Sequence, residues 1–377
     1  MSKTLQELLH MVDRRTRVWL AVCGDALENA ESICSTYSNE GYTCMNQDAV
    51  RNSFFQKTIE YTQGRNWLEI GPGAHALLTQ MALRKPTLHS LVAVEANEQS
   101  ALEARKCVKH DSRCRIITGY STTYAGEKCV DVVLSEIIGV IASSEGVIGV
   151  MNDLRMRRYA TQSTAMIPAR AATFIAPVQL GSIDICRGGN VYASERILLL
   201  RGMRVDSANL ANDVGMLEDL HFDMLIADRL THHSTLQIVK SGQCHGFGMF
   251  VGISSPMPCR RYTRSKIATV EKWHANDMWT TSDASDHHYS RNWRNPVALL
   301  STPLAVCVGD VLNLICIVDH ATTSAPVYSI CYSLNGNPMG QLTLTHTDMY
   351  PTFQLLQAEM KYDRSYSNMT IPVKQQP

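Results

Sequence analysis

The stretch that decides the predicted fold is Val130-Asp-Val-Val-Leu-Ser-Glu136-Ile-Ile-Gly-Val-Ile-Ala-Ser-Ser-Glu145-Gly-Val147. Its first part is an apolar run with β-branched residues, which is typical of a buried parallel strand. The run ends at Glu136, and Glu145 follows nine residues later across a loop of small residues. Ligands of open α/β sheets bind beyond the carboxyl ends of the strands, so we expect both carboxylates at one ligand site.

A pair of carboxylates at this spacing is compatible with three roles. The two groups can grip a guanidinium, whose five N–H donors form a rigid fork. They can also act as the acid and base of a glycoside hydrolase. In the third role, Glu136 is a surface acid at the end of a strand and Glu145 is an acid favoured by the dipole at the start of a helix. The pair alone leaves all three open.

Length and composition limit the class of protein. At 377 residues and 42.0 kDa the chain exceeds the usual size of one hydrophobic core, which predicts two domains. Lys and Arg total 35, as do Asp and Glu, which argues against a dedicated nucleic-acid-binding protein. Twelve cysteines without a Cys-x-x-Cys motif predict reduced thiols rather than a disulfide framework or zinc ribbon. The sequence shows no secretory leader and no apolar run of membrane-spanning length, so we expect a soluble protein.

Two further strand ends point to a nucleotide-like ligand. Trp67-Leu-Glu-Ile-Gly71-Pro-Gly73 is a short apolar strand that breaks into Gly-x-Gly before a helix, where the backbone can approach a ligand closely. A second strand, Leu91–Glu95, ends in an acid about twenty residues past the glycines, where nucleotide-binding folds grip ribose hydroxyls. A third candidate strand starts at Arg113, and Ser121 and Thr122 follow it where a base can lie. These runs predict an alternating β/α half with one shared ligand edge.

The segment before the glycine loop is predicted to be helical. Met45, Asp48, Arg51 and Phe55 recur at steps of three and four residues and so share one helical face. Asp48 and Arg51 can form an internal ion pair, but their position just before the loop favours contact with the ligand. Apolar residues from Leu5 onward have helical spacing, so residues 1–40 are predicted to be an N-terminal helical segment.

The periodicity of apolar residues along the chain changes near Pro168. Beyond it, runs with a period of two are separated by turn residues, which predicts an antiparallel barrel or sandwich. We therefore place one domain at residues 41–168 and a second at 169–377. Residues 183–213 interrupt the strand pattern and by sequence alone can be a long surface loop.

These motifs, in their order along the chain, resemble those of the protein arginine methyltransferases. The matching residues are Gly71-Pro-Gly73, Glu95, Ser135-Glu136, Glu145 and, upstream, Met45-x-x-Asp48-x-x-Arg51. Residues 290–296, which contain Asn292 and Trp293, resemble the threonine-histidine-tryptophan loop of that family. The resemblance runs from about residue 41 to 312. It implies a Rossmann-like class I methyltransferase domain followed by an antiparallel β-barrel domain, an α/β plus β fold, with residues 183–213 as a dimerisation arm.

The resemblance also implies a role for each site residue. Glu136 and Glu145 would hold the substrate arginine, and Arg51 would hold the methionine carboxylate of S-adenosylmethionine. Glu95 would bind the ribose, Ser121 and Thr122 would lie near adenine, and Trp293 would wall the arginine channel. The catalytic set is then Glu136, Glu145, Asp48, Trp293, Met45 and Asn292. The cofactor set is Arg51, Gly71, Gly73, Glu95, Ser121, Thr122 and Glu136, with S-adenosylhomocysteine as the product and no metal.

The sequence departs from the family pattern at three positions. His75 stands at the third glycine of the loop, Asn292 at the histidine that pairs with the aspartate matched by Asp48, and Tyr42 at another histidine. An amide forms hydrogen bonds but carries no proton, so the resemblance predicts no proton relay through Asp48 and Asn292. The Ser-Glu-Gly at Glu145 and the Tyr-Ser-Thr at Ser121 look closest to the monomethylating, type III branch.

The predicted function is therefore methyl transfer from S-adenosylmethionine to arginine in proteins, giving monomethylarginine. The alternatives are a symmetric dimethylating enzyme, a catalytically silent paralogue that regulates an active partner, and a methyltransferase for small molecules. The expected substrates are proteins with exposed arginines, with RNA-binding proteins and histones as candidates. We expect a homodimer in the cytoplasm, with the nucleus as a second compartment, and no contact with membranes or nucleic acid.

Overall fold

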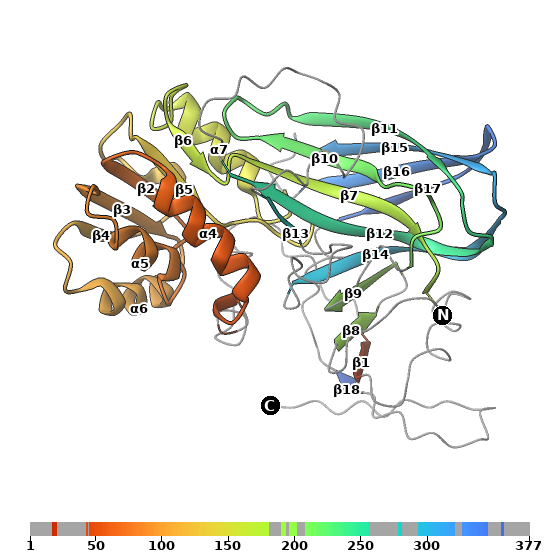
Figure 1. Ribbon diagram of the computed structural model, residues 1–377, viewed down its shortest axis with the longest axis horizontal. Coiled ribbons are helices and arrows are strands. Elements are labelled where there is room, and N and C mark those ends of the chain that lie inside the picture. Colours follow the sequence, from red (N-terminus) through yellow and green to blue (C-terminus); the bar gives the residue numbers. More distant parts are fainter. Residues whose placement is uncertain are drawn as a thin grey trace.

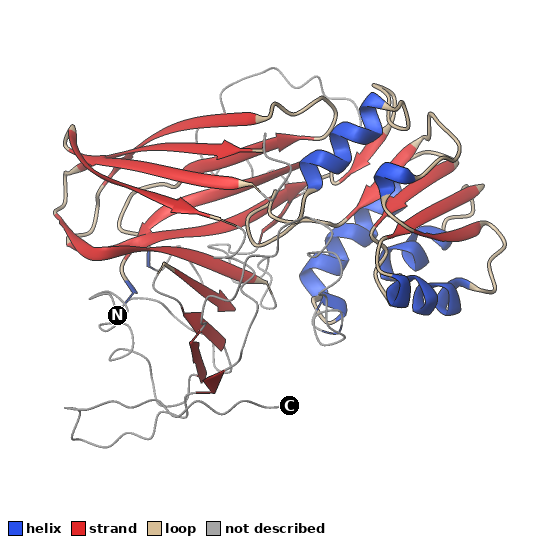
Figure 2. Ribbon diagram, turned by 180° about the vertical axis from the view of Figure 1, so that it is seen from behind, coloured by secondary structure: helices blue, strands red, loops and turns tan. Residues whose placement is uncertain are grey.

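The computed structural model describes residues 17–20, 43, 45–180, 190–193, 196–201, 208–255, 278–280, 293–320, 326–345 and 356–357. A parallel sheet with helices forms one part of the molecule, and long antiparallel strands form the other (Figure 1). Seen from behind, all of the long helices lie around the parallel sheet (Figure 2). Within these ranges no helix combines the length and the apolar character needed to cross a membrane.

The parallel sheet follows the predicted alternation of strands and helices. Its order is β4-β3-β2-β5-β6, and every pair in it is parallel. The strands are β2 (Asn66–Ile70), β3 (Ser90–Glu95), β4 (Cys114–Thr118), β5 (Val132–Ser135) and β6 (Ala165–Ile167). The helices are α4 (Ala49–Tyr61), α5 (Leu77–Leu83), α6 (Glu98–Val108), α7 (Val147–Met156) and the short 3-10 helix η1 (Ser121–Thr123). The Rossmann-like part of the predicted fold is confirmed.

Burial explains why β5 forms inside this sheet, between β2 and β6. All four of its residues are buried, and Val132, Val133 and Leu134 join one core with Trp67 of β2 and Leu91 of β3. Each such side chain stabilises the fold by about 1.5–3 kcal/mol when it leaves water. The strand therefore ends at Ser135 in a fixed position, and Glu136 follows at the carboxyl edge of the sheet.

The remaining strands form two sheets that share a second core. The order of the larger sheet is β10-β7-β12-β14-β9-β8-β1-β18, with β13 paired to β12, and that of the smaller is β11-β15-β16-β17. The larger sheet comprises β1 (Arg17–Leu20), β7 (Arg170–Val178), β8 (Asn190–Ala193), β9 (Ile197–Arg201), β10 (Gly215–His221), β12 (Gly242–Ser254), β13 (Met278–Thr280), β14 (Arg294–Val306) and β18 (Leu356–Gln357). The smaller comprises β11 (Arg229–Gln237), β15 (Val311–Asp319), β16 (Val327–Leu334) and β17 (Asn337–Leu344). The antiparallel part is thus confirmed, but the pairings of the described strands do not close into a single barrel.

Two segments differ from the sequence-based expectation. Arg17–Leu20 forms strand β1 inside residues 1–40, where a helical segment was expected, because it pairs with strands from distant parts of the chain. Within the predicted arm at 183–213, Asn190–Ala193 (β8) and Ile197–Arg201 (β9) are strands of the larger sheet. Ile197 and Leu199 are buried in the second core, so this part of the segment belongs to the larger sheet, and its role in dimerisation stays a prediction. The other residues of both segments lie outside the described ranges, except 196 and 208–213.

An ion pair between β7 and β10 gives a prediction on stability. Arg170 Nε and Nη2 donate to the two carboxylate oxygens of Asp219 at 2.6 and 2.5 Å. Burial by itself raises the pKa of Asp219, but hydrogen bonds from His221 and Arg170 and their charges outweigh it and lower the pKa to about 2. The ionised carboxylate therefore stabilises the fold above its unfolded pKa near 4, and this contribution is lost as the pH falls toward 2.

We expect Asp219→Asn to lower the free energy of unfolding by about 2 kcal/mol at pH 7. The deficit relative to the unmodified protein should shrink as the pH is lowered below 4. Urea unfolding at pH 7 and at pH 3 measures both quantities. A deficit of equal size at the two pH values would contradict the assignment of this stability to the ionised carboxylate.

Candidate active site

A cavity lies at the carboxyl edge of the parallel sheet and collects most of the predicted site residues. Those that line it are Met45, Arg51, Gly71, Gly73, Glu95, Ser121, Glu136 and Glu145. They come from α4 and the turn before it, from the end of β3, from the segments after β2, β4 and β5, and from the turn before α7. Residues as far apart as 45 and 145 therefore face one ligand space, as strand ends in an open α/β sheet do.

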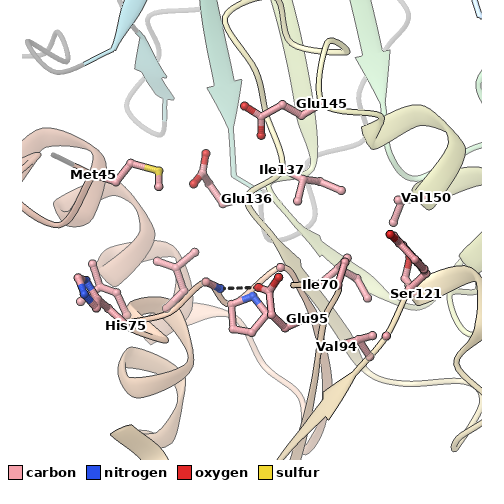
Figure 3. A pocket seen from close by; sticks show the side chains of 18 of the residues that line it. Met45, Ile70, His75, Val94, Glu95, Ser121, Glu136, Ile137, Glu145 and Val150 are labelled. Atoms are coloured by element: carbon pink, nitrogen blue, oxygen red, sulfur yellow. Dashed lines mark hydrogen bonds between the residues drawn. The ribbon is translucent and has the colours of Figure 1, made fainter. Parts of the chain in front are cut away.

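The glycine loop and Glu95 line one part of this cavity, and Figure 3 shows Glu95 below Glu136 and Glu145. Gly71 and Gly73 have φ values of 73° and 65°, in the left-handed region that favours glycine. Glu95 accepts hydrogen bonds from the backbone N–H groups of Gly73 and Asn97, each at 2.9 Å. Burial raises the pKa of Glu95, while hydrogen bonds from the N–H groups of Asn97, Gly73 and Ala96 oppose the rise. One carboxylate thus fixes the loop and the start of α6.

Glu136 and Arg51 form a buried ion pair at the opposite side of the site. Arg51 Nη2 donates to Glu136 Oε2 at 2.5 Å, and the two side chains are 6% and 5% exposed. Asp48 caps helix α4 by accepting the N–H of Arg51 at 3.1 Å, which fixes the first turn of the helix. Burial raises the pKa of Glu136, the charge and hydrogen bond of Arg51 lower it, and the nearby Asp48 raises it. Arg51 Nε and Glu136 Oε1 are buried without a hydrogen-bond partner among the described residues.

Glu145 lies at the same end of the cavity as Glu136. In Figure 3 the two carboxylates and the side chain of Met45 surround one part of the pocket, and Glu95 lies below them. Gly146, at φ 82°, follows Glu145 as the N-cap of α7. The chain therefore turns sharply between the carboxylate and the helix, in a conformation that glycine adopts at low cost.

Three other predicted residues of the described ranges do not line the cavity. Thr122 is exposed, and of that pair only Ser121 lines the cavity. Asp48 is buried as the cap of α4. Trp293 donates its Nε1–H to the carbonyl of Gly139 at 3.3 Å and so supports the loop between the two glutamates, and its role as a wall of the arginine channel stays a prediction. Asn292 and Tyr42 lie outside the described residues.

The structure adds residues that the sequence reading missed. Asn46, Ile137 and Val150 line the cavity, and Asn46 Nδ2 contacts His75 Nδ1. Asn46 and Ile137 are direct sequence neighbours of the predicted residues Met45 and Glu136, and this proximity was the signal that could have found them. Arg157, at the end of α7, is not close in sequence to any predicted site residue. It donates to the carbonyls of Ser121 and Tyr124 at 2.5 and 2.6 Å and holds the η1 turn in place.

Gly71 is the loop position where a side chain should be least tolerated. A Cβ atom there would lie 2.9 Å from Ile137 Cγ2, in a backbone conformation that L-residues rarely adopt. We expect Gly71→Ala to cost about 1–3 kcal/mol of stability and to weaken binding of S-adenosylhomocysteine in calorimetry. Gly149→Ala is the matched control, because that exposed glycine on α7 has open space around it. The control should gain about 0.5–1 kcal/mol, and equal behaviour of the two variants would contradict the prediction.

The fold and the cavity can be compared with those of known proteins. No protein-family model and no curated protein matches the chain. Among solved structures, protein arginine methyltransferase 10 of Arabidopsis thaliana, in an open conformation, is 15% identical with a TM-score of 0.61, covering 84% of this chain and 99% of that chain. The PRMT1 enzyme-prozyme heterotetrameric complex of Trypanosoma brucei with AdoHcy is 15% identical with a TM-score of 0.59, covering 80% of this chain and 97% of that chain. The chain therefore shares its fold, from the parallel sheet through the antiparallel sheets, with protein arginine methyltransferases.

Proposed function

We propose that this protein transfers a methyl group from S-adenosylmethionine to the guanidinium nitrogen of an arginine in a protein substrate. The observation that carries the proposal is the single cavity in which the glycine loop and Glu95 lie opposite Glu136 and Glu145. A glycoside hydrolase would not need the glycine loop and Glu95. A nucleotide-binding protein without catalysis would not need the two glutamates. The shared fold with arginine methyltransferases supports the same choice.

The residues of the cavity fit S-adenosylmethionine. Gly71 leaves the backbone accessible, and the Glu95 carboxylate can accept hydrogen bonds from ribose hydroxyls in addition to its two backbone bonds. The unpaired Nε–H of Arg51 is a buried donor for a carboxylate such as that of the methionine portion. Ser121 is buried beside the predicted adenine position. When bound, the cofactor supplies an electrophilic methyl group on its sulfonium.

The two glutamates would orient and polarise the substrate guanidinium. Methyl transfer to nitrogen is an in-line displacement, so alignment of the attacking nitrogen is the main requirement. Carboxylates on two sides hold the planar guanidinium in register and draw its positive charge away from the attacking nitrogen. Glu136 Oε1, which has no partner in the described part of the chain, offers one acceptor for this purpose.

We further propose monomethylarginine as the product and flexible arginine-containing segments of proteins, such as RNA-binding proteins or histones, as substrates. The support for the product is the resemblance of residues 120–122 and 144–146 to the monomethylating branch. We propose a homodimer from the same family resemblance, and a cytoplasmic or nuclear location from the twelve cysteines without a Cys-x-x-Cys motif. An arginine that enters a pocket needs an extended, accessible backbone, which favours disordered segments.

The test of this function is transfer of label from S-adenosylmethionine to an arginine-glycine-rich peptide by the purified chain. A peptide with lysine in place of arginine is the matched control and should stay unlabelled. Acid hydrolysis of the labelled peptide separates monomethylarginine from the dimethylated forms. Cofactor binding without any transfer would overturn the enzymatic proposal, and dimethylarginine would overturn only the proposed product.

A second candidate function is a silent paralogue that activates a partner enzyme. The contact of Asn46 with His75 inside the cavity favours it, because the family pattern has a glycine at the position of His75. The Trypanosoma brucei structure with the same fold is itself an enzyme-prozyme complex. Under this function the chain would label the peptide only after it is mixed with an active methyltransferase.

A further inference from the structure

A buried polar cluster lies outside the cavity, where the loop between the two glutamates meets both antiparallel sheets. Its members are Ser143 of the loop, Thr173 of β7, Glu218 of β10 and Tyr328 of β16, all fully buried. Glu218 accepts hydrogen bonds from Ser143 N at 3.0 Å, from Ser143 Oγ at 2.6 Å and from Thr173 Oγ1 at 2.9 Å. A carboxylate that is removed from water is retained at such a place only when its hydrogen bonds are satisfied.

The hydrogen bonds of the cluster lead from the loop to Glu218. Thr173 Oγ1 accepts from the N–H of Ala142 at 2.9 Å and gives its own proton to Glu218. Ser143 Oγ also donates to Glu218, and the Tyr328 hydroxyl is hydrogen-bonded to Ser143 Oγ at 2.7 Å. All donors therefore converge on one carboxylate, which ties two successive backbone N–H groups of the loop to the antiparallel sheets.

The tied backbone lies directly before Glu145. Ser143 precedes Glu145 by two residues, so the peptide group that Glu218 holds is part of the short backbone stretch that carries Glu145. The earlier part of the loop is held separately by the bond from Trp293 to Gly139. We propose that Glu218 is a positioning residue that sets the place of the Glu145 carboxylate in the cavity, an inference that rests on the proposed function.

Asp219 provides a matched control for Glu218. The two residues are neighbours on β10, so their side chains point to opposite faces of the sheet. Asp219 pairs with Arg170 and His221, and within the described part of the chain none of its hydrogen bonds or ion pairs involves the loop before Glu145. Both variants, Glu218→Gln and Asp219→Asn, replace one carboxyl group of the same strand by an amide. We expect only Glu218→Gln to disturb the loop before Glu145.

The experiment makes three measurements on the full chain. These are affinity for S-adenosylhomocysteine, kcat and KM for the arginine peptide, and amide hydrogen exchange of residues 139–147. For Glu218→Gln we expect unchanged affinity for the cofactor product, a loss of kcat/KM of about tenfold or more, and faster exchange in the loop. For Asp219→Asn we expect lower global stability with unchanged loop exchange and unchanged kcat/KM.

Thr173→Val gives a second, nearly isosteric test if Glu218→Gln does not fold. It removes the acceptor of the Ala142 N–H and should produce the same loop exchange and the same loss of kcat/KM in smaller degree. Equal behaviour of the Glu218 and Asp219 variants would overturn the inference, as would a loss of kcat/KM with an unchanged loop. If the unmodified chain transfers no methyl group, the proposed function fails, whereas the exchange comparison still decides whether Glu218 holds the loop.

Discussion

Glu136→Gln is expected to lower the rate of methyl transfer to the arginine peptide by about 100- to 1000-fold, the usual loss for one preorganised electrostatic partner. The substitution keeps the shape of the side chain but removes the charge that would align the guanidinium and polarise it. A neutral amide also presents an N–H group on one side, which repels a donor instead of accepting from it. Single-turnover measurement of transfer at saturating cofactor separates this effect from weaker binding.

The same substitution should also destabilise the fold, because Glu136 neutralises Arg51 in a buried pair. The side chains of Arg51 and Glu136 are only 6% and 5% exposed. Removal of the Glu136 charge therefore leaves an uncompensated buried charge on Arg51, at a cost of about 3–5 kcal/mol. Glu145→Gln is the control, since the buried Arg51 pairs with Glu136. It should lose transfer to a similar extent with a smaller loss of stability. Retained transfer in both folded variants would contradict the role of the two carboxylates.

Residues at strand ends could be predicted from the sequence because their signal is local. The apolar run of β5 and the run of β3 each end at an acid, and both acids line the cavity. The Gly-x-Gly after β2 likewise needs only neighbouring residues to be recognised, and Gly71 adopts the positive φ that such a turn requires. The fold class followed from the same alternation of runs.

Long-range contacts could not be predicted in this way. Glu218 contacts Ser143 across 75 residues, and in the sequence it stands beside a second acid, Asp219, so no local signal marks it as buried. A polar residue in such a pattern looks like a surface residue until the packing of the two sheets places it inside. For the same reason the contact of the Trp293 indole N–H with the loop carbonyl of Gly139 could not be predicted. The strand at Arg17–Leu20 depends on partners more than 150 residues away.

Glu69 shows how a buried acid can link the cofactor loop to pH. It lies on β2 two residues before Gly71, is 1% exposed and accepts a hydrogen bond from Thr79 Oγ1 of α5 at 2.6 Å. This bond joins the strand and the helix on either side of the glycine loop. Burial raises the pKa of Glu69 to about 8, the Thr79 hydrogen bond opposes the rise, and the charge of Glu95 adds to it. The folded protein therefore binds a proton at neutral pH that the unfolded chain releases.

The raised pKa of Glu69 determines how the stability of the fold depends on pH. A carboxyl group whose folded pKa lies above its unfolded value stabilises the fold fully below the unfolded pKa, and this contribution is lost as the pH rises through the folded pKa. Between pH 4.5 and pH 8 the loss from Glu69 amounts to about 5 kcal/mol. Glu69→Gln does not titrate, so its stability relative to the unmodified protein should rise over this range.

We therefore expect Glu69→Gln to be no more stable than the unmodified protein at pH 5 and clearly more stable at pH 8.5, as measured by urea unfolding at both values. Because Gln retains an oxygen that can accept from Thr79, the comparison isolates the ionisation from the loss of the hydrogen bond. Asp219→Asn serves as a control of opposite sign, since its contribution is lost toward low pH. A difference between Glu69→Gln and the unmodified protein that stays constant from pH 5 to 8.5 would mean that Glu69 is already ionised beneath the glycine loop. The strand and helix that hold Gly71 would then carry a buried charge, and we would expect S-adenosylhomocysteine affinity to be independent of pH over the same range.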